Sequence, residues 1–227
     1  MTRIIQYLSG MSNGFFVVEN SVIAVDSGSA EGEDIFREAC RIAGIKPQEI
    51  VLLITTHGHV DHFININAMK KLTGAPILCH REAAPYLIEG SYPDVVARNE
   101  IGRAILERQE REGPPVAHVP KVEPDIIIGD EPYNMTDWGI SGKLLYTPGH
   151  SKGCISLVLD SGEAIVGDLF ASFEGNPPCP AVFVSPGADS SELFQSLKYL
   201  LSLGINTFYS GHGGPFATDT VRNCIES

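Results

Sequence analysis

Short blocks of apolar residues in the first half of the chain alternate with longer amphipathic stretches, a pattern that predicts strands separated by helices. The block Ile50–Ile54 is apolar at every position, which is typical of a strand buried on both faces. The stretch 31–43 carries apolar residues at helical spacing and ends before Gly44, which predicts a helix with a glycine stop. The expected strands cover residues 4–8, 15–18, 22–25, 50–54 and 77–79, and the expected helices cover 31–43 and 62–72.

The strand pattern returns after residue 125. Asp160-Ser161-Gly162 separates two apolar blocks and predicts a tight hairpin, and Asp189 and Glu192 stand at the spacing of a capping box. The expected strands here cover residues 126–128, 143–147, 155–159, 164–166 and 205–209, and the expected helix covers 189–203. Because both halves combine strands with helices, the sequence predicts an α/β sandwich of two mixed or mostly antiparallel sheets with helices outside.

The stretch of about 85–125 differs from the rest because prolines punctuate it and a charged helix is expected over 94–112. It is too short and too polar to hold a core of its own, so we expect a single domain over 1–227 with a helical excursion. Irregular segments often carry specificity. Tyr92, Arg98 and Arg103 are candidates to meet an anionic substrate, although a solvated helix face is the simpler interpretation.

The composition of the chain argues against several classes of protein. The chain has 16 basic and 28 acidic residues, a net charge of −12, so we expect it to bind neither nucleic acid nor a membrane surface. No apolar run approaches the roughly 20 residues of a membrane span, and the N-terminus lacks the apolar core of a signal peptide. Five scattered cysteines without a CxxC motif suggest neither disulfides nor a cysteine zinc site. We expect a cytoplasmic protein that acts on a small molecule; the oligomeric state stays open.

The segment His57-Gly58-His59-Val60-Asp61-His62 concentrates imidazole and carboxylate groups just after a buried strand. These groups are the usual ligands of zinc and related metals at catalytic sites. His57 and His59 alternate by two and can point to one centre, whereas Asp61 and His62, at the start of the next helix, can point to a second.

Three later residues are also potential metal ligands, and each stands at the end of an expected strand. His150 stands in Thr147-Pro148-Gly149-His150, Asp168 follows Gly167, and His212 lies between Gly211 and Gly213. Neighbouring glycines let the backbone turn sharply there.

This series of motifs resembles the metal-ligand series of the metallo-β-lactamase superfamily, in the same order and over almost the whole chain. The resemblance implies a four-layer αβ/βα sandwich with a binuclear site at one edge. It also implies a structural role for Asp26. By this resemblance, His57, His59 and His150 hold one metal ion, Asp61, His62 and His212 hold the other, and Asp168 bridges the two.

Two such cations lower the pKa of a bridging water toward about 7, and the resulting hydroxide can attack a carbonyl carbon. Asp61 is the expected catalytic residue, because it could hydrogen-bond this hydroxide and later carry a proton. Zinc is the expected metal, with iron or manganese as alternatives, because mixed nitrogen and oxygen ligands accept all three.

Differences between subfamilies bear on the substrate. β-Lactamases of this superfamily place Cys or Ser where Asp168 stands, so the chain resembles the short glyoxalase II-like proteins, which cleave thioesters. Two alternatives remain open: a lactonase, and a mononuclear iron persulfide dioxygenase using His57, His150 and Asp168. His80 and His118 stand outside the series, and we interpret them as ordinary structural histidines. Phe170 and Phe173 could either wall a pocket or pack in the core.

Overall fold

The first sheet gathers the apolar blocks of the N-terminal half. The computed structural model describes residues 1–113, 118–173, 176–186 and 190–226. From edge to edge, the strands are β1 (Arg3–Ser9), β2 (Ser12–Val18), β3 (Val22–Val25), β4 (Ile50–Ile54), β5 (Ile77–His80) and β7 (Ile126–Ile128). β1 to β3 are antiparallel, whereas β3, β4, β5 and β7 are parallel. The carboxyl ends of β3 and β4 therefore meet at one edge, where the chain continues into Asp26 and Thr55.

The second sheet is built from the C-terminal half. From edge to edge, its strands are β16 (Phe216–Ala217), β15 (Thr207–Tyr209), β11 (Glu163–Ile165), β10 (Ile155–Leu159), β9 (Gly142–Tyr146) and β8 (Tyr133–Asn134). Its pairs are antiparallel except β11 with β15. Two further ribbons pair β12 (Phe170–Ala171) with β13 (Cys179–Pro180) and β14 (Phe183–Val184) with β6 (Val96–Ala97).

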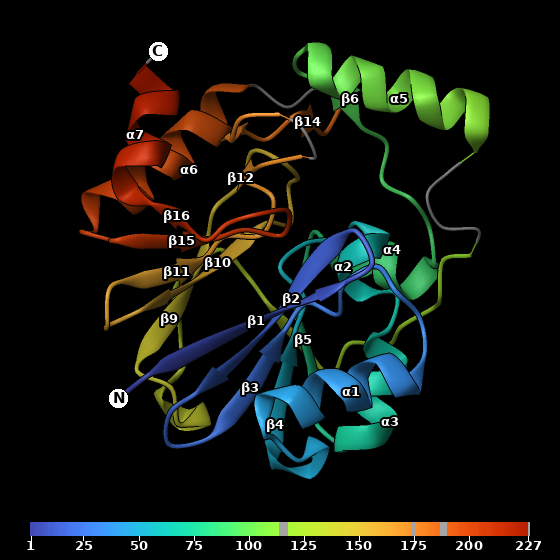
Figure 1. Ribbon diagram of the computed structural model, residues 1–227, viewed down its shortest axis with the longest axis vertical. Coiled ribbons are helices and arrows are strands. Elements are labelled where there is room, and N and C mark those ends of the chain that lie inside the picture. Colours follow the sequence, from blue (N-terminus) through green and yellow to red (C-terminus); the bar gives the residue numbers. More distant parts are fainter. Residues whose placement is uncertain (114–117, 174–175, 187–189, 227) are drawn as a thin grey trace.

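Helices cover the outer faces of the two sheets (Figure 1). The helices on the first sheet are α1 (Glu33–Ala43), α2 (Val60–Phe63), α3 (Ile66–Thr73) and α4 (Ala84–Glu89), and those on the second are α6 (Ser190–Ser202) and α7 (Thr218–Glu226). Short 3-10 turns span Pro47–Glu49 and Thr136–Trp138. The predicted αβ/βα sandwich is thus confirmed.

Three apolar layers hold this arrangement together. One lies between the sheets and includes Phe15 and Leu52 from the first sheet and Leu157 from the second. The other two lie between each sheet and its helices, around Phe36 and Phe208. All five side chains are fully or almost fully buried, and such burial is the dominant favourable term in folding.

Two predicted helices have different bounds in the structure. The helix expected over 62–72 is divided at Asn65, whose backbone N–H donates to Ser27 Oγ in place of a helical carbonyl while its side chain bonds to the backbone of Gly32. The helix expected from residue 94 begins only at Glu100, as α5 (Glu100–Glu112). Val96 and Ala97 pair with β14 instead, and the Asn99 side chain accepts a hydrogen bond from the Gly102 N–H as an N-cap.

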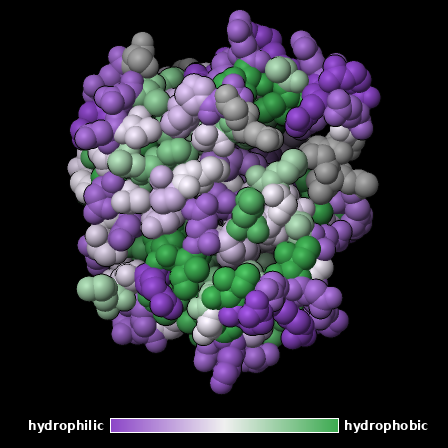
Figure 2. Space-filling view, in the orientation of Figure 1, coloured by the Kyte–Doolittle hydropathy of each residue, from purple (hydrophilic) through white to green (hydrophobic). Residues whose placement is uncertain are grey.

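Other differences are smaller. Neither α4 nor α7 was predicted, and the proposed cap residue Asp189 lies outside the described residues. None of the helices in the described part of the chain is long and apolar enough to cross a bilayer. On the face shown in Figure 2, hydrophilic side chains cover much of the region of α1, whereas the region of α5 shows hydrophobic and hydrophilic side chains next to one another.

Candidate metal centre

The loop after β4 and the start of α2 carry four of the seven predicted site residues. β4 ends at Ile54, and His57 and His59 lie in the loop that follows. His59 is the residue before α2, and Asp61 and His62 lie on that helix. The parallel pairing of β4 with its neighbours brings this loop to the edge where the two sheets meet.

The other three residues come from the second sheet. His150 follows β9, Asp168 follows β11, and His212 follows β15. Gly211 brings the backbone close to the centre, because a Cβ at this position would lie 2.2 Å from Asp168 Oδ1 and 2.4 Å from His62 Cε1. Only a residue without a side chain leaves room for the groups beside it.

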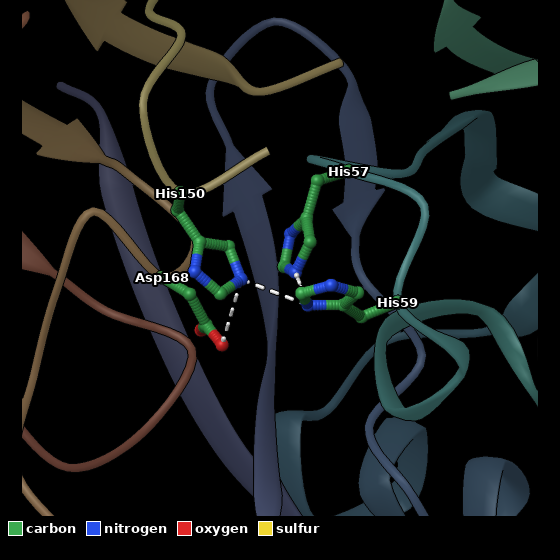
Figure 3. A group of neighbouring side chains, drawn as sticks. All are labelled: His57, His59, His150 and Asp168. Carbon is green, nitrogen blue, oxygen red and sulfur yellow. Dashed lines mark hydrogen bonds and ion pairs between the residues drawn. The ribbon is translucent and has the colours of Figure 1, made fainter. Parts of the chain in front are cut away.

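Figure 3 shows the first group, in which His57 and His59 from one loop, His150 after β9 and Asp168 after β11 point toward one another. One ligand atom of each lies within 4.8 Å of the others. His59 Nδ1 lies 3.1 Å from His57 Nε2 and 2.8 Å from His150 Nε2, and Asp168 Oδ2 lies 3.7 Å from His150 Nε2. Three imidazoles and one carboxylate thus surround one small volume.

The second group consists of Asp61, His62 and His212. His212 Nε2 lies 3.2 Å from Asp61 Oδ2, and His62 Nε2 lies 3.6 Å from the same oxygen. Asp168 also faces this group, with its oxygens 3.4 Å from His62 Nε2 and 3.3 Å from His212 Nε2. Asp168 therefore lies between the two groups.

Outer partners fix four of the rings with Nε2 facing inward. His150 Nδ1 donates to the Phe183 carbonyl at 3.0 Å, and His212 Nδ1 donates to the Met11 carbonyl at 2.9 Å. His62 Nδ1 lies 2.8 Å from Asp26 Oδ2, and His57 Nδ1 lies 3.0 Å from Thr56 Oγ1. A carbonyl oxygen can only accept, so the neutral rings of His150 and His212 carry their lone pairs on Nε2.

Asp26 organises the loop from outside the centre. Its carboxylate accepts hydrogen bonds from the Thr56 N–H and hydroxyl, both at 2.7 Å, besides contacting His62. Its φ is 57°, in the left-handed region where Asp is tolerated better than most residues. The structure thus places Asp26 against a ring and a loop of the centre, as the resemblance implied.

Burial and neighbouring charges shift the pKa values of the histidines in opposite directions in the two groups. Burial lowers the pKa of His59 to about 3, helped by His150. Burial also opposes a charge on His212, but Asp168 and Asp61 outweigh it and raise the pKa of His212 to about 10. Asp168, Asp61 and Asp26 likewise raise the pKa of His62 well above its ordinary value despite burial.

The donor set fits divalent cations. His62 Nε2 and Asp168 Oδ1 are buried and have no hydrogen-bond partner in the described structure. Inward lone pairs of the neutral rings face carboxylate oxygens and one another, an arrangement that repels unless a proton or metal ion lies between them. Imidazole nitrogens with carboxylate oxygens suit zinc, iron or manganese.

We expect metal uptake by the metal-free protein to release protons at pH 7. His62 and His212 are protonated below their raised pKa values, and a metal ion must displace those protons, so about two should leave per protein. Affinity should therefore rise with pH. Calorimetric titration of zinc in buffers of different ionisation enthalpy measures the number; a buffer-independent heat at pH 7 would contradict the expectation.

Other residues singled out in the sequence lie outside the two groups. His80 is buried, stacks on Tyr146 with ring centroids 4.6 Å apart, and lies 3.1 Å from Asp130 Oδ1 through Nε2. His118 is exposed. Phe173 lies against the site, with its ring centroid 5.0 Å from that of His212.

Phe170 is fully buried, and Arg98 bonds to backbone carbonyls. The interpretation of Arg98 as part of a solvated helix face was therefore wrong. Thr56, Met11 and Phe183 contact the rings as well, and none of them was predicted from the sequence. Thr56 could have been found from its place directly before the histidine motif. The Met11 and Phe183 partners could not, because backbone carbonyls are present in every residue and do not depend on the side chain.

Comparison with known proteins finds one family and several relatives. The family model described as the metallo-beta-lactamase superfamily matches residues 9–212. A probable metallo-hydrolase of Bacillus subtilis, YqgX, is 25% identical over 205 residues, which cover 89% of this chain and 85% of that protein. A probable metallo-hydrolase of Methanocaldococcus jannaschii is 27% identical over 203 residues, covering 89% and 87%.

Solved structures share the fold. The B3 metallo-β-lactamase BLEG-1 superposes with a TM-score of 0.69 at 18% identity, covering 98% of this chain and 97% of that one. The Thermus thermophilus family protein TTHA1429 superposes with a TM-score of 0.67 at 20% identity, covering 99% and 77%. The protein TTHA1623, solved in a di-iron-bound form, gives a TM-score of 0.67 at 21% identity, covering 98% of both chains.

Proposed function

Because the chain belongs to the metallo-β-lactamase superfamily, we propose that it is a metal-dependent hydrolase of ester-type carbonyl bonds, most similar to the thioester-cleaving glyoxalase II-like branch. One observation carries this proposal: seven imidazole and carboxylate side chains converge in two groups that share Asp168. Among the relatives, the two named above are described as probable metallo-hydrolases, which supports the same reaction class.

The residues fit two divalent cations, for which we propose zinc. His57, His59 and His150 would hold one, Asp61, His62 and His212 the other, and Asp168 would contact both. Such ions supply Lewis acidity and a water of lowered pKa. The outer contacts from Asp26, Thr56 and the two carbonyls keep the rings oriented for this role.

Asp61 is the proposed proton carrier. Its side chain is 19% exposed, more than the 9% of Asp168, so it can reach the solvent side of the centre. Burial favours its neutral form, but His62 and His212 outweigh burial and lower the pKa of Asp61 below its ordinary value. The group is therefore ionised at neutral pH, and since Oδ2 faces His62 and His212, we propose that Oδ1 accepts the proton and passes it on.

The site favours a leaving group that needs no acid assistance. A thiolate meets this condition because its conjugate acid has a pKa near about 8.5. Cys154, close to His150 in sequence, does not provide a competing nucleophile, since it is buried and burial raises the pKa of its thiol to about 11. Arg98 is engaged by carbonyls, so it does not provide a cation for the carboxylates of glutathione.

Metal analysis combined with a substrate panel tests the proposal. The purified protein is analysed for metals by mass spectrometry and assayed with a glutathione thioester, a glutathione-free thioester, a lactone, a phosphodiester and glutathione persulfide. Zinc with thioester cleavage, lost on chelation and restored by zinc, supports it. Iron with oxygen uptake on the persulfide would select the dioxygenase, and turnover of the lactone alone would select a lactonase.

A further inference from the structure

The segment Pro180–Val184, here called the 180–184 segment, connects two ligand positions of the metal centre. At one end, the Ala181 N–H donates to the carbonyl of Leu169 at 3.0 Å, directly after Asp168. Pro180 also pairs with Phe170 in the β12–β13 ribbon. At the other end, the Phe183 carbonyl accepts the hydrogen bond from His150 Nδ1. A shift of this segment would therefore reach both ligands.

Arg98 binds the same segment through three carbonyl oxygens. Its backbone N–H donates to Val182 at 2.8 Å, its Nε to Ala181 at 2.6 Å and its Nη2 to Pro180 at 3.0 Å. Its guanidinium also lies over the ring of Phe194, 5.7 Å from the centroid. Only a planar fork of N–H donors can serve adjacent carbonyls and a ring face together.

The strand pairing next to Arg98 couples these contacts to His150. Ala97, the residue before Arg98, pairs with Phe183, whose carbonyl meets the ring. Gly102 at the start of α5 lies so close that a Cβ would be 2.4 Å from the Val182 carbonyl. The excursion is thus attached to the 180–184 segment by backbone, side chain and close packing, with Arg98 at the centre of the contact.

We propose that Arg98 is a positioning residue of the metal centre: it holds the 180–184 segment so that the Phe183 carbonyl keeps His150 in the tautomer with Nε2 facing His59 and Asp168. The inference rests on the proposed function only in requiring that the centre binds metal. The described contacts of Arg98 include no metal ligand. Its effect passes through the 180–184 segment, directly to His150 by the Phe183 carbonyl and only through the backbone of Leu169 and Phe170 to Asp168.

This route predicts an unequal effect on the two groups. His150 belongs to the first group, whereas His212 is oriented by Met11, which comes from the hairpin between β1 and β2. Loss of Arg98 should therefore weaken metal binding at the first group by up to about 10-fold, the lower end of what losing a direct partner of a ligand costs, because Arg98 acts one step further out. The second group should stay closer to the wild type.

Three variants test this. Arg98→Met keeps a long side chain over Phe194 but has no donors, and Arg98→Lys keeps a charge and one donor group. Arg103→Met is the matched control, because Arg103 lies on α5, is 57% exposed and pairs with Glu100. Zinc affinity is measured in competition with a chromophoric chelator, the spectrum of the cobalt-loaded protein reports ligand geometry, and thermal unfolding of the chelated protein reports folding.

We expect Arg98→Met to weaken one of two zinc affinities and alter the cobalt spectrum, Arg98→Lys to recover part of the loss, and Arg103→Met to match the wild type. Equal affinities in Arg98→Met and Arg103→Met would overturn the inference while leaving the proposed function intact. An equal loss at both sites with lowered thermal stability would reduce Arg98 to a structural residue. A wild-type protein that takes up no metal would instead overturn the proposed function, and this inference with it.

Discussion

Replacing Gly211 with alanine is expected to remove metal binding and hydrolysis together. The added Cβ would lie 2.2 Å from Asp168 Oδ1 and 2.4 Å from His62 Cε1, far inside van der Waals contact. Neither group can move aside cheaply, because His62 is held by Asp26 and both lie in the buried centre. Losing a hydrogen-bond partner of a metal ligand already costs 10- to 100-fold in metal affinity or activity, so we expect at least about a 100-fold loss of turnover here. Turnover is measured with the best substrate of the panel, and the metal content is measured alongside.

Gly129→Ala is the matched control for this variant. A Cβ at Gly129 would meet only the end of the Arg81 side chain, at 3.6 Å, which is an ordinary contact. This variant should load metal and turn over substrate like the wild type. If Gly211→Ala kept its full metal content, the two groups could not be arranged around Gly211 as the structure has them.

Much of the fold could be predicted because each of these strands is marked by a short run of consecutive, mostly apolar residues. The apolar blocks 22–25, 50–54, 126–128 and 155–159 became strands with the expected bounds. Apolar residues make up most or all of each block, so the pattern in the sequence needs no knowledge of the partner strand. The helix before Gly44, α1, was also found to within two residues of its expected bounds.

Elements that depend on a distant partner could not be predicted. Val96 and Ala97 lie inside the helix expected over 94–112, but they pair with Phe183 and Val184, which lie far away in the sequence. The division of the helix at Asn65 is also a long-range effect, because its backbone N–H bonds to the distant Ser27 hydroxyl. Tertiary contacts outweigh helix propensity at both positions, since propensities amount to fractions of a kcal/mol per residue.

The candidate centre shows the same division. Its imidazoles and carboxylates could be predicted, because they are the usual metal-ligand types and stand in motifs directly after strands. The edges of the two sheets bring them together. The groups that orient the rings include carbonyls of Met11 and Phe183, which every residue possesses and no sequence pattern marks. Arg98 was misplaced for the same reason, because its acceptors are carbonyls of Pro180 and Ala181.

Asp168→Asn is expected to disable both metal positions, because the carboxylate faces both groups. Its oxygens lie 3.7 Å from His150 Nε2 in the first group and 3.3 Å from His212 Nε2 in the second. Asparagine keeps the shape but removes the charge that offsets two dications. We expect at least about a 100-fold loss of turnover, more than an outer contact costs, and less than two metal ions per protein by mass spectrometry.

Asp160→Asn provides the control for charge, because Asp160 is exposed in the turn between β10 and β11.

The Asp168→Asn variant should also change the number of protons released on metal binding. Asp168 is the leading group that raises the pKa of His212 against burial, so that pKa falls without the carboxylate. The His212 imidazolium then loses its proton at a lower pH, so the proton release that accompanies residual zinc uptake should disappear at a lower pH than in the wild type. Full metal content with unchanged proton release in Asp168→Asn would show that this carboxylate does not join the two groups.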